Sequence, residues 1–120
     1  MAQSNLFSIR VLTFAISLVF LGLIGAASAQ DPKVQRGQKL YADNRCQMCH
    51  SIQGKGNAKG PLDEVGTKLT AEQIRQWLIN PAEMTGKTKA TRKPPMPPYA
   101  KLAKEDVDAL VTYLQTLKKK

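Results

Sequence analysis

The segment Cys46-Gln47-Met48-Cys49-His50 is the feature that most constrains how this 120-residue chain can fold. Two cysteines three positions apart, with a histidine directly after the second, predict covalent attachment of a c-type haem. Each thiol would add to one of the vinyl groups on neighbouring pyrroles, and one turn of backbone spans both attachment points. The imidazole of His50 then lies next to the iron and can be its proximal ligand. A chain with this motif must fold around a large apolar disc.

Other interpretations of the two cysteines fit the chain less well. A thioredoxin-like dithiol needs a βαβ context, and we find no strand-like alternation of polar and apolar residues. A disulfide between Cys46 and Cys49 would close a very small loop and add little stability. A structural zinc site needs four ligands, normally Cys or His, and the chain has only two cysteines and one histidine.

The N-terminal segment predicts export. Residues 1–29 contain one charged residue, Arg10, and residues 11–25 are apolar. Ala27 and Ala29 fit a cleavage site before Gln30, so we expect a secretory signal peptide at 1–29 and a domain at 30–120. The alternative is an uncleaved membrane anchor, because a span needs about 20 apolar residues and 11–29 come close. Either way we expect the domain to be exported, periplasmic or anchored facing the periplasm.

Local signals predict three helices and no internal repeat. Asp31 and Pro32 are typical of a helix start, so the first helix should run from Pro32 to the first cysteine. Thr70 and Gln73 have capping-box spacing and open a second helix, which ends at Asn80 and Pro81. The third should follow Leu102, with acidic residues in its first turns and lysines at its end. Residues 51–60 and 82–101 are expected to be loops.

Gly37 predicts where the first and last helices meet. Glycine is unfavourable inside a helix by about 1 kcal/mol relative to alanine, and it leaves room for close approach of another helix. The last helix offers a suitable apolar face, with Tyr113 beside it: Val107, Leu110, Val111, Leu114 and Leu117. We therefore expect Gly37 and Tyr41 to pack against this helix.

A second axial ligand must come from a residue other than histidine, because His50 is the only one. Methionine, lysine, the N-terminal amine and water are the candidates, or the position has no ligand. Met48 lies between the two cysteines, which leaves Met84 and Met96. We expect Met96, because the prolines on both sides of it stiffen its loop. Ligation by His and Met raises the reduction potential, and it leaves no iron position for a substrate, so we do not expect an enzyme.

Together these motifs resemble the small monohaem class I cytochromes c of the bacterial periplasmic type. The resemblance covers about residues 33–118 and rests on five motifs in order: C46-x-x-C-H50, G60-P-L-D-E-V-G66, the helix with Trp77, P95-M-P-P-Y99 and L110-V-T-Y-L114. It implies an all-α cytochrome c fold, with three main helices around one covalently attached haem and with the N- and C-terminal helices crossing.

The resemblance also implies roles for individual residues. Cys46 and Cys49 would hold the haem, and His50 and Met96 would bind the iron. The carbonyl of Pro61 would accept a hydrogen bond from the His50 imidazole. Trp77, otherwise a core aromatic, or Tyr99 would reach the haem propionates. One departure is Ala103, where relatives usually have a Ser or Thr cap on the last helix, and its loss costs about 1 kcal/mol.

The expected function is one-electron transfer between respiratory or photosynthetic redox proteins. Without residues 1–29 the formal charge is one less than the +9 of the whole chain. This basic surface should steer a monomer to acidic patches on its partners. The expected docking cations lie in loops that should frame the haem: Lys55, Lys59, Lys87, Lys89, Arg92 and Lys93. Nucleic acid is not an expected partner, given export and the lack of interleaved aromatic residues.

Two alternative functions stay open at this point. A haem-based ligand sensor or a small peroxidase would need an open or labile iron position. A tethered cytochrome subunit of a larger oxidoreductase would be held in the membrane by residues 11–29.

Overall fold

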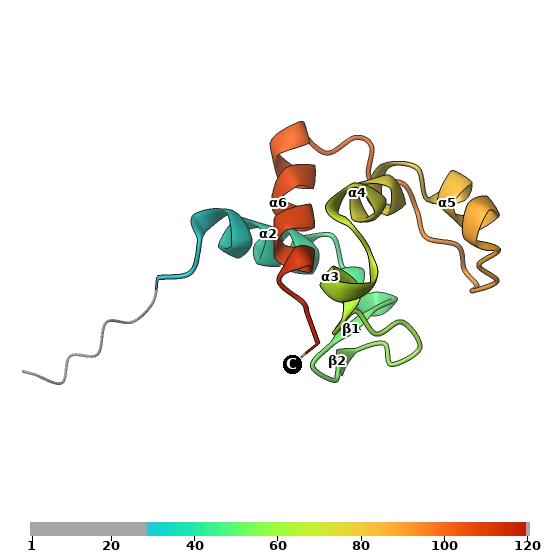
Figure 1. Ribbon diagram of the computed structural model, residues 1–120, viewed down its shortest axis with the longest axis horizontal. Coiled ribbons are helices and arrows are strands. Elements are labelled where there is room, and N and C mark those ends of the chain that lie inside the picture. The colour runs from blue at the N-terminus through green and yellow to red at the C-terminus, as the bar shows by residue number, and fades with distance from the viewer. Residues whose placement is uncertain (1–28, 120) are drawn as a thin grey trace, which may run out of the picture.

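The computed structural model describes residues 29–119, which form a mainly helical domain (Figure 1). The predicted signal peptide, apart from Ala29, lies outside these residues. The elements are, in order, α2 (Pro32–Asp43), a 3-10 turn (Cys46–Met48), β1 (Ser51–Ile52), β2 (Lys55–Gly56), α3 (Val65–Lys68), α4 (Ala71–Ile79), α5 (Pro81–Thr88) and α6 (Lys104–Gln115). Between residues 29 and 119, no helix has the length and apolar character needed to cross a membrane.

Helix α2 begins as predicted and ends slightly earlier. The Asp31 carboxylate accepts a hydrogen bond from the backbone N–H of Lys33 at 2.7 Å, and Pro32 is the first helical residue. At the other end, the Asn44 side-chain amide donates to the Leu40 carbonyl at 2.8 Å. Arg45 then adopts a left-handed φ of 54°. The chain therefore changes direction before Cys46, and a separate short turn holds the cysteines.

The crossing of α2 and α6 is confirmed, with Gly37 at the contact (Figure 1). A Cβ atom on Gly37 would lie 2.6 Å from the Cβ of Tyr113 and would overlap the carbonyl oxygen of Ala109. One turn further along, the rings of Tyr41 and Tyr113 pack edge to face with centroids 6.1 Å apart. At the rim of the contact, Arg36 pairs with Asp106 at 2.5 Å. The first and last helices of the domain are thus packed against one another.

Helix α4 packs on the other side of α6. Its capping box is confirmed, because Thr70 Oγ1 accepts from the N–H of Gln73 at 3.2 Å and Gln73 Oε1 accepts from the N–H of Thr70 at 2.9 Å. Arg75 and Asp108 form an ion pair of 2.6 Å between the two helices, and its hydrogen bond and charge hold the pKa of the Asp108 carboxyl below its usual range. The buried core lies between these helices: Ile74, Leu78, Val107, Leu110, Val111 and Leu114.

The prediction of a plain loop at 51–60, and of a chain without strands, is wrong in detail. Strands β1 and β2 pair antiparallel, with Ser51 opposite Gly56 and Ile52 opposite Lys55. The turn is made by Gln53 and Gly54, with φ values of 51° and 74°. Strands of two residues are too short to show a polar–apolar alternation, which is why the sequence pattern gave no indication of them.

The prediction of a loop from residue 82 onward is also wrong, because α5 occupies its first part. Asn80 ends α4 and precedes α5, and its side-chain amide donates to the Glu83 carboxylate at 2.5 Å. Pro81 suits the first helical position because its φ is already fixed. The helix has only two buried side chains, Pro81 and Met84, and this is too few to produce an apolar period.

Helix α6 has the uncapped start that the sequence predicts. Ala103 is the N-cap residue, and no side chain accepts from the first backbone N–H groups there. Glu105 and Asp106 lie in the first turn and complement the positive end of the helix dipole.

We predict that Gly37→Ala lowers the free energy of unfolding of the haem-containing protein by about 1–3 kcal/mol, because α6 leaves no space for a methyl group. Gly86→Ala is the matched control. Gly86 is exposed in α5, and a Cβ atom there would have no neighbour within 4 Å. This substitution should be neutral or stabilising by about 0.5–1 kcal/mol. Denaturant unfolding gives both values, and equal effects at the two positions would contradict the close contact.

Candidate haem-binding site

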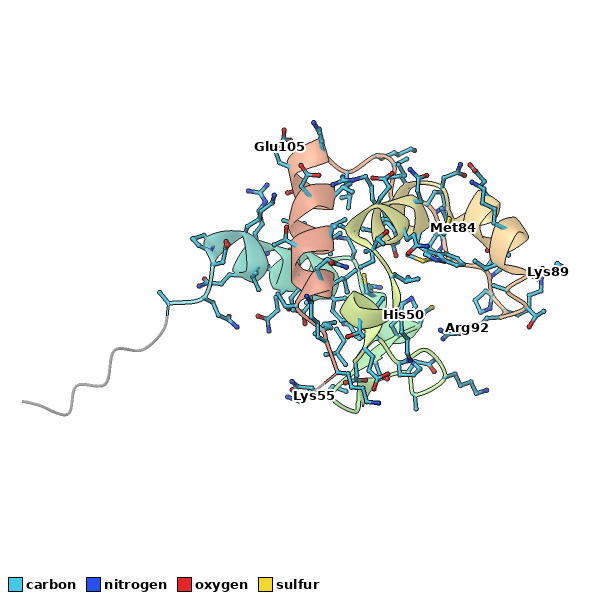
Figure 2. All side chains as sticks on the ribbon, viewed as in Figure 1. His50, Lys55, Met84, Lys89, Arg92 and Glu105 are labelled. Atoms are coloured by element: carbon cyan, nitrogen blue, oxygen red, sulfur yellow. The ribbon has the colours of Figure 1, made fainter. Side chains whose placement is uncertain are left out.

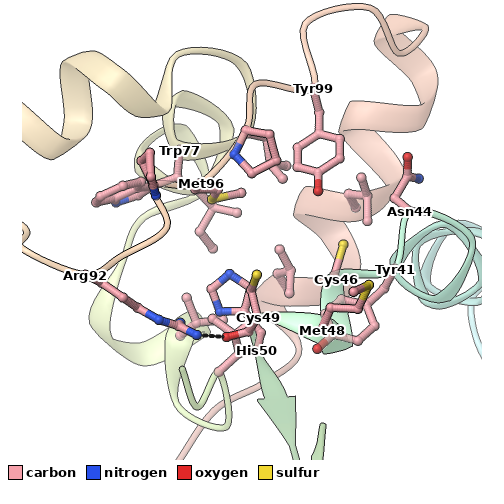
Figure 3. Close-up of a pocket in the computed structure, with 18 of the residues that line it drawn as sticks. Tyr41, Asn44, Cys46, Met48, Cys49, His50, Trp77, Arg92, Met96 and Tyr99 are labelled. Atoms are coloured by element: carbon pink, nitrogen blue, oxygen red, sulfur yellow. Dashed lines mark hydrogen bonds between the residues drawn. The ribbon is translucent and has the colours of Figure 1, made fainter. Parts of the chain in front are cut away.

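A cavity of about 470 Å³ lies between the cysteine segment, α4, α6 and the loop that follows α5 (Figure 3). Its walls are mostly aliphatic: Leu62, Val65, Leu69, Ile74, Leu78, Leu110 and Leu114. The size is within the range of pockets that hold small molecules and cofactors. The apolar core of the domain therefore forms one wall of a binding site.

The cysteine segment brings its reactive groups to one side of this cavity. The backbone N–H groups of Cys49 and His50 donate to the carbonyl of Cys46 at 3.1 and 2.9 Å, which closes a tight turn. Both cysteines are free thiols that line the cavity together with His50 (Figure 3). Burial raises the pKa of the Cys46 thiol to about 11. Two thiols and one imidazole thus face the same apolar space.

His50 is oriented by a backbone carbonyl, but not by the predicted one. Its Nδ1 lies 3.1 Å from the carbonyl oxygen of Gly60. Because a carbonyl can only accept, Nδ1 carries the proton, and Nε2 keeps a lone pair for a metal. Burial lowers the pKa of His50, which favours this neutral form.

The prediction that Pro61 supplies this carbonyl is wrong by one residue. Ser51 and Pro61 form a parallel bridge, in which the N–H of Ser51 donates to the Gly60 carbonyl at 3.1 Å and the N–H of Leu62 donates to the Ser51 carbonyl at 2.8 Å. This bridge turns the Gly60 carbonyl toward the histidine segment. Pro61 itself is exposed and does not line the cavity.

Met96 lies across the cavity from His50 (Figure 3). Three prolines of the same loop, Pro94, Pro95 and Pro97, also line the cavity. Met84 is 9% exposed in α5 and does not line it. The fold thus brings one of the two candidate methionines to the site and buries the other elsewhere.

The two aromatic candidates lie at different parts of the cavity. Trp77 lines it from α4, on the same side as Met96 (Figure 3). Tyr99 lines it near the cysteines, with its hydroxyl beside the Cys46 thiol, and burial raises the pKa of Tyr99. The two side chains therefore face different parts of the cavity.

The sequence indicates other roles for two residues of the site. Tyr41 lines the cavity as well as packing on α6, and its buried hydroxyl has no hydrogen-bond partner among residues 29–119. Burial raises the pKa of Tyr41 to about 12. Arg92 also lines the cavity, and its guanidinium donates to the Cys49 carbonyl. The apolar stripe of α2 indicated Tyr41 as a packing residue, whereas no local pattern indicated the contact of Arg92.

The residues of the cavity fit a covalently bound haem. Two thiols lie on one side for thioether bonds, a neutral imidazole and a thioether sulfur lie on opposite faces, and aliphatic walls enclose the space between them. Such a group, when bound, supplies an iron that takes up and releases one electron.

Comparison with known proteins agrees with this fit. The sequence profile of the family "Cytochrome c" matches residues 34–118, and the chain therefore belongs to the cytochrome c family. The chain is 28% identical to cytochrome c-555 of Methylococcus capsulatus, over 86% of this chain and 80% of that protein. It is 26% identical to cytochrome c oxidase subunit 2 of Alkalihalophilus pseudofirmus, over 78% of this chain and 29% of that longer protein. No solved structure matches the chain significantly.

Family membership confirms the predicted fold class and the cofactor, a covalently attached haem c. It also gives the general activity, which is electron transfer, and the kind of partner, which is another redox protein. Members of the family are typically electron carriers and not enzymes.

Proposed function

We propose that this protein is an exported one-electron carrier whose haem iron is bound by His50 and Met96. The supporting observation is that the His50 imidazole and the Met96 side chain face one another across the cavity that both cysteines line (Figure 3). Ligation by His and Met raises the reduction potential. With both ligands retained in each oxidation state, the iron has no position for a substrate.

The residues around the two ligands limit how far they move when the iron changes charge. His50 Nδ1–H donates to the Gly60 carbonyl, and this bond fixes the ring orientation. Pro61 restricts the backbone next to that carbonyl. On the other face, the prolines that flank Met96 restrict its loop. The aliphatic walls exclude water from the space between the ligands.

In this proposal Cys46 and Cys49 form the thioether bonds, and Trp77 donates to a propionate. The vinyl and propionate groups lie on opposite edges of the macrocycle, so a residue beside Cys46 is at the wrong edge for a propionate. Tyr99 has its hydroxyl beside the Cys46 thiol. We therefore assign Tyr99 to the thioether edge and Trp77 to the propionate edge.

Export remains part of the proposal, supported by the N-terminal pattern and by covalent haem attachment. Cleavage makes Gln30 the first residue of the mature protein. A second candidate function is a cytochrome subunit tethered to a larger oxidoreductase, favoured by the match to part of an oxidase subunit 2. Mass determination of the exported protein separates the two, because a tethered subunit retains residues 11–29.

The proposed docking surface is narrower than the sequence alone indicated. Lys87 pairs with Glu83 and Arg92 donates to Cys49, so neither is a free docking charge. The remaining four cations make no ion pair within residues 29–119: Lys55, Lys59, Lys89 and Lys93. Lys55 is in strand β2 of the hairpin, and Lys89 directly follows α5 (Figure 2). These charges would attract an acidic patch on a redox partner.

We predict that Met96→Leu abolishes the weak sulfur-to-iron absorption band of the ferric protein and lets the ferrous protein bind carbon monoxide at neutral pH. Leucine fills similar volume but cannot bind iron. Met84→Leu is the matched control, since Met84 does not line the cavity, and it should retain the band. A band that survives Met96→Leu would contradict the ligation. Rapid carbon monoxide binding by the unmodified protein would favour a sensor or peroxidase.

We further predict that the rate of electron exchange with an acidic flavodoxin falls by about tenfold when ionic strength rises from about 10 mM to 150 mM, as the screening length shortens from about 30 Å to 8 Å. Replacing the four docking lysines by Gln should lower the rate at low salt and flatten this dependence. The control with equal net charge replaces lysines near helix ends: Lys33, Lys104, Lys118 and Lys119. Identical behaviour of the two variants would contradict a localised docking surface.

A further inference from the structure

The loop that presents Met96 has few attachments to the rest of the domain. Residues 91–98 form no helix or strand. Within residues 29–119, Arg92 makes the hydrogen bond that joins this stretch to another part of the chain. The next attachment is the N–H of Tyr99, which donates to the Leu78 carbonyl at 2.7 Å. Met96 therefore lies between two anchors, Arg92 on one side and Tyr99 on the other.

The Arg92 anchor reaches the segment that holds the haem. Its guanidinium Nη2 donates to the carbonyl oxygen of Cys49, the residue directly before His50 (Figure 3). The two residues are 43 positions apart in the sequence. The Cys49 carbonyl accepts no other hydrogen bond within the described residues. This hydrogen bond thus joins the loop that carries Met96 to Cys49, the residue next to His50.

Gly60 completes this contact. A Cβ atom on Gly60 would lie 2.8 Å from Cζ of Arg92 and would overlap the Cys49 carbonyl oxygen. Because the Cys49 carbonyl belongs to the backbone, only a residue without a side chain fits beside it at this point. The same Gly60 accepts the hydrogen bond of His50 at its carbonyl, so Arg92 packs on the group that orients the histidine.

Charge alone does not account for the position of Arg92. The neighbouring Lys93 belongs to the same loop and makes no hydrogen bond or ion pair within the described residues. The planar guanidinium presents several donors in a fixed fork, whereas an ammonium group is a flexible point charge. A hydrogen bond with a charged donor is also stronger than one between neutral groups.

We propose that Arg92 is a positioning residue that ties the Met96 loop to Cys49 and so holds Met96 opposite His50. The proposal rests on the proposed ligation by Met96. Without the bond, the nearest hydrogen bond from the loop to the rest of the domain is at Tyr99, and Met96 leaves the iron more often. The expected consequence is a site that opens transiently to outside ligands while the helical core stays folded.

The test uses the haem-containing protein with Arg92→Ala, Arg92→Gln, Arg92→Lys and Lys93→Ala. We expect Arg92→Ala to speed carbon monoxide binding to the ferrous protein by about three- to tenfold, the factor that corresponds to one lost hydrogen bond. Its sulfur-to-iron band should disappear on heating well before the helical circular dichroism signal. Arg92→Gln and Arg92→Lys should retain part of the effect of arginine. Lys93→Ala, whose proposed role is in partner docking, should keep the carbon monoxide binding rate and the sulfur-to-iron band of the unmodified protein.

Each other outcome overturns the proposal. Carbon monoxide binding unchanged by Arg92→Ala would show that the bond does not restrain Met96. An equal acceleration by Lys93→Ala would show that loop charge, and not the bond to Cys49, is responsible. If Arg92→Ala does not accumulate with haem, the carbon monoxide binding rates of Arg92→Gln and Lys93→Ala are compared instead, and the same criteria apply. If the sulfur-to-iron band survives Met96→Leu, Met96 is not the iron ligand and the proposed function fails. If the band depends on Met96 but stays intact on heating in every Arg92 variant, only the role of Arg92 fails.

Discussion

The apolar face of α6 and α4 is the constraint on which the rest of the structure depends. Leu110 and Leu114 belong both to the buried core and to the wall of the haem cavity, so the same side chains pack the domain and surround the cofactor. A domain of this size buries a limited core of its own. The covalently attached macrocycle enlarges that core, so it adds to the stability of the domain as well as supplying the redox group.

Two contacts between distant parts of the chain hold this apolar layer in place. The contact of Gly37 with Ala109 and Tyr113 joins the ends of the chain and fixes α6 against α2. On the opposite side, the bridge between Ser51 and Pro61 aims the Gly60 carbonyl at His50. The first contact sets the position of the cavity wall, and the second sets the direction of the His50 nitrogen that we propose binds the iron. Electron transfer at fixed coordination needs both, because a mobile ligand adds reorganisation at every change of charge.

Sequence reasoning predicted those features that depend on local chemistry. The CxxCH motif, the Asp31 and Thr70 caps and the glycine at the helix crossing each have a short-range signature. The features that it missed depend on distant contacts or short elements. The choice of Gly60 over Pro61 follows from a backbone bridge, and the contact of Arg92 with Cys49 joins residues 43 positions apart. Helix α5 buries too few side chains to leave an apolar period.

The central claim is that a sulfur and an imidazole bind the iron in both oxidation states. X-ray absorption at the iron edge tests it most directly, because it measures the ligand atoms without a partner protein or an added ligand. The account predicts a single sulfur neighbour in the ferric and in the ferrous protein, with little change in its distance. Loss of the sulfur in either state, or its presence unchanged in Met96→Leu, would contradict the account.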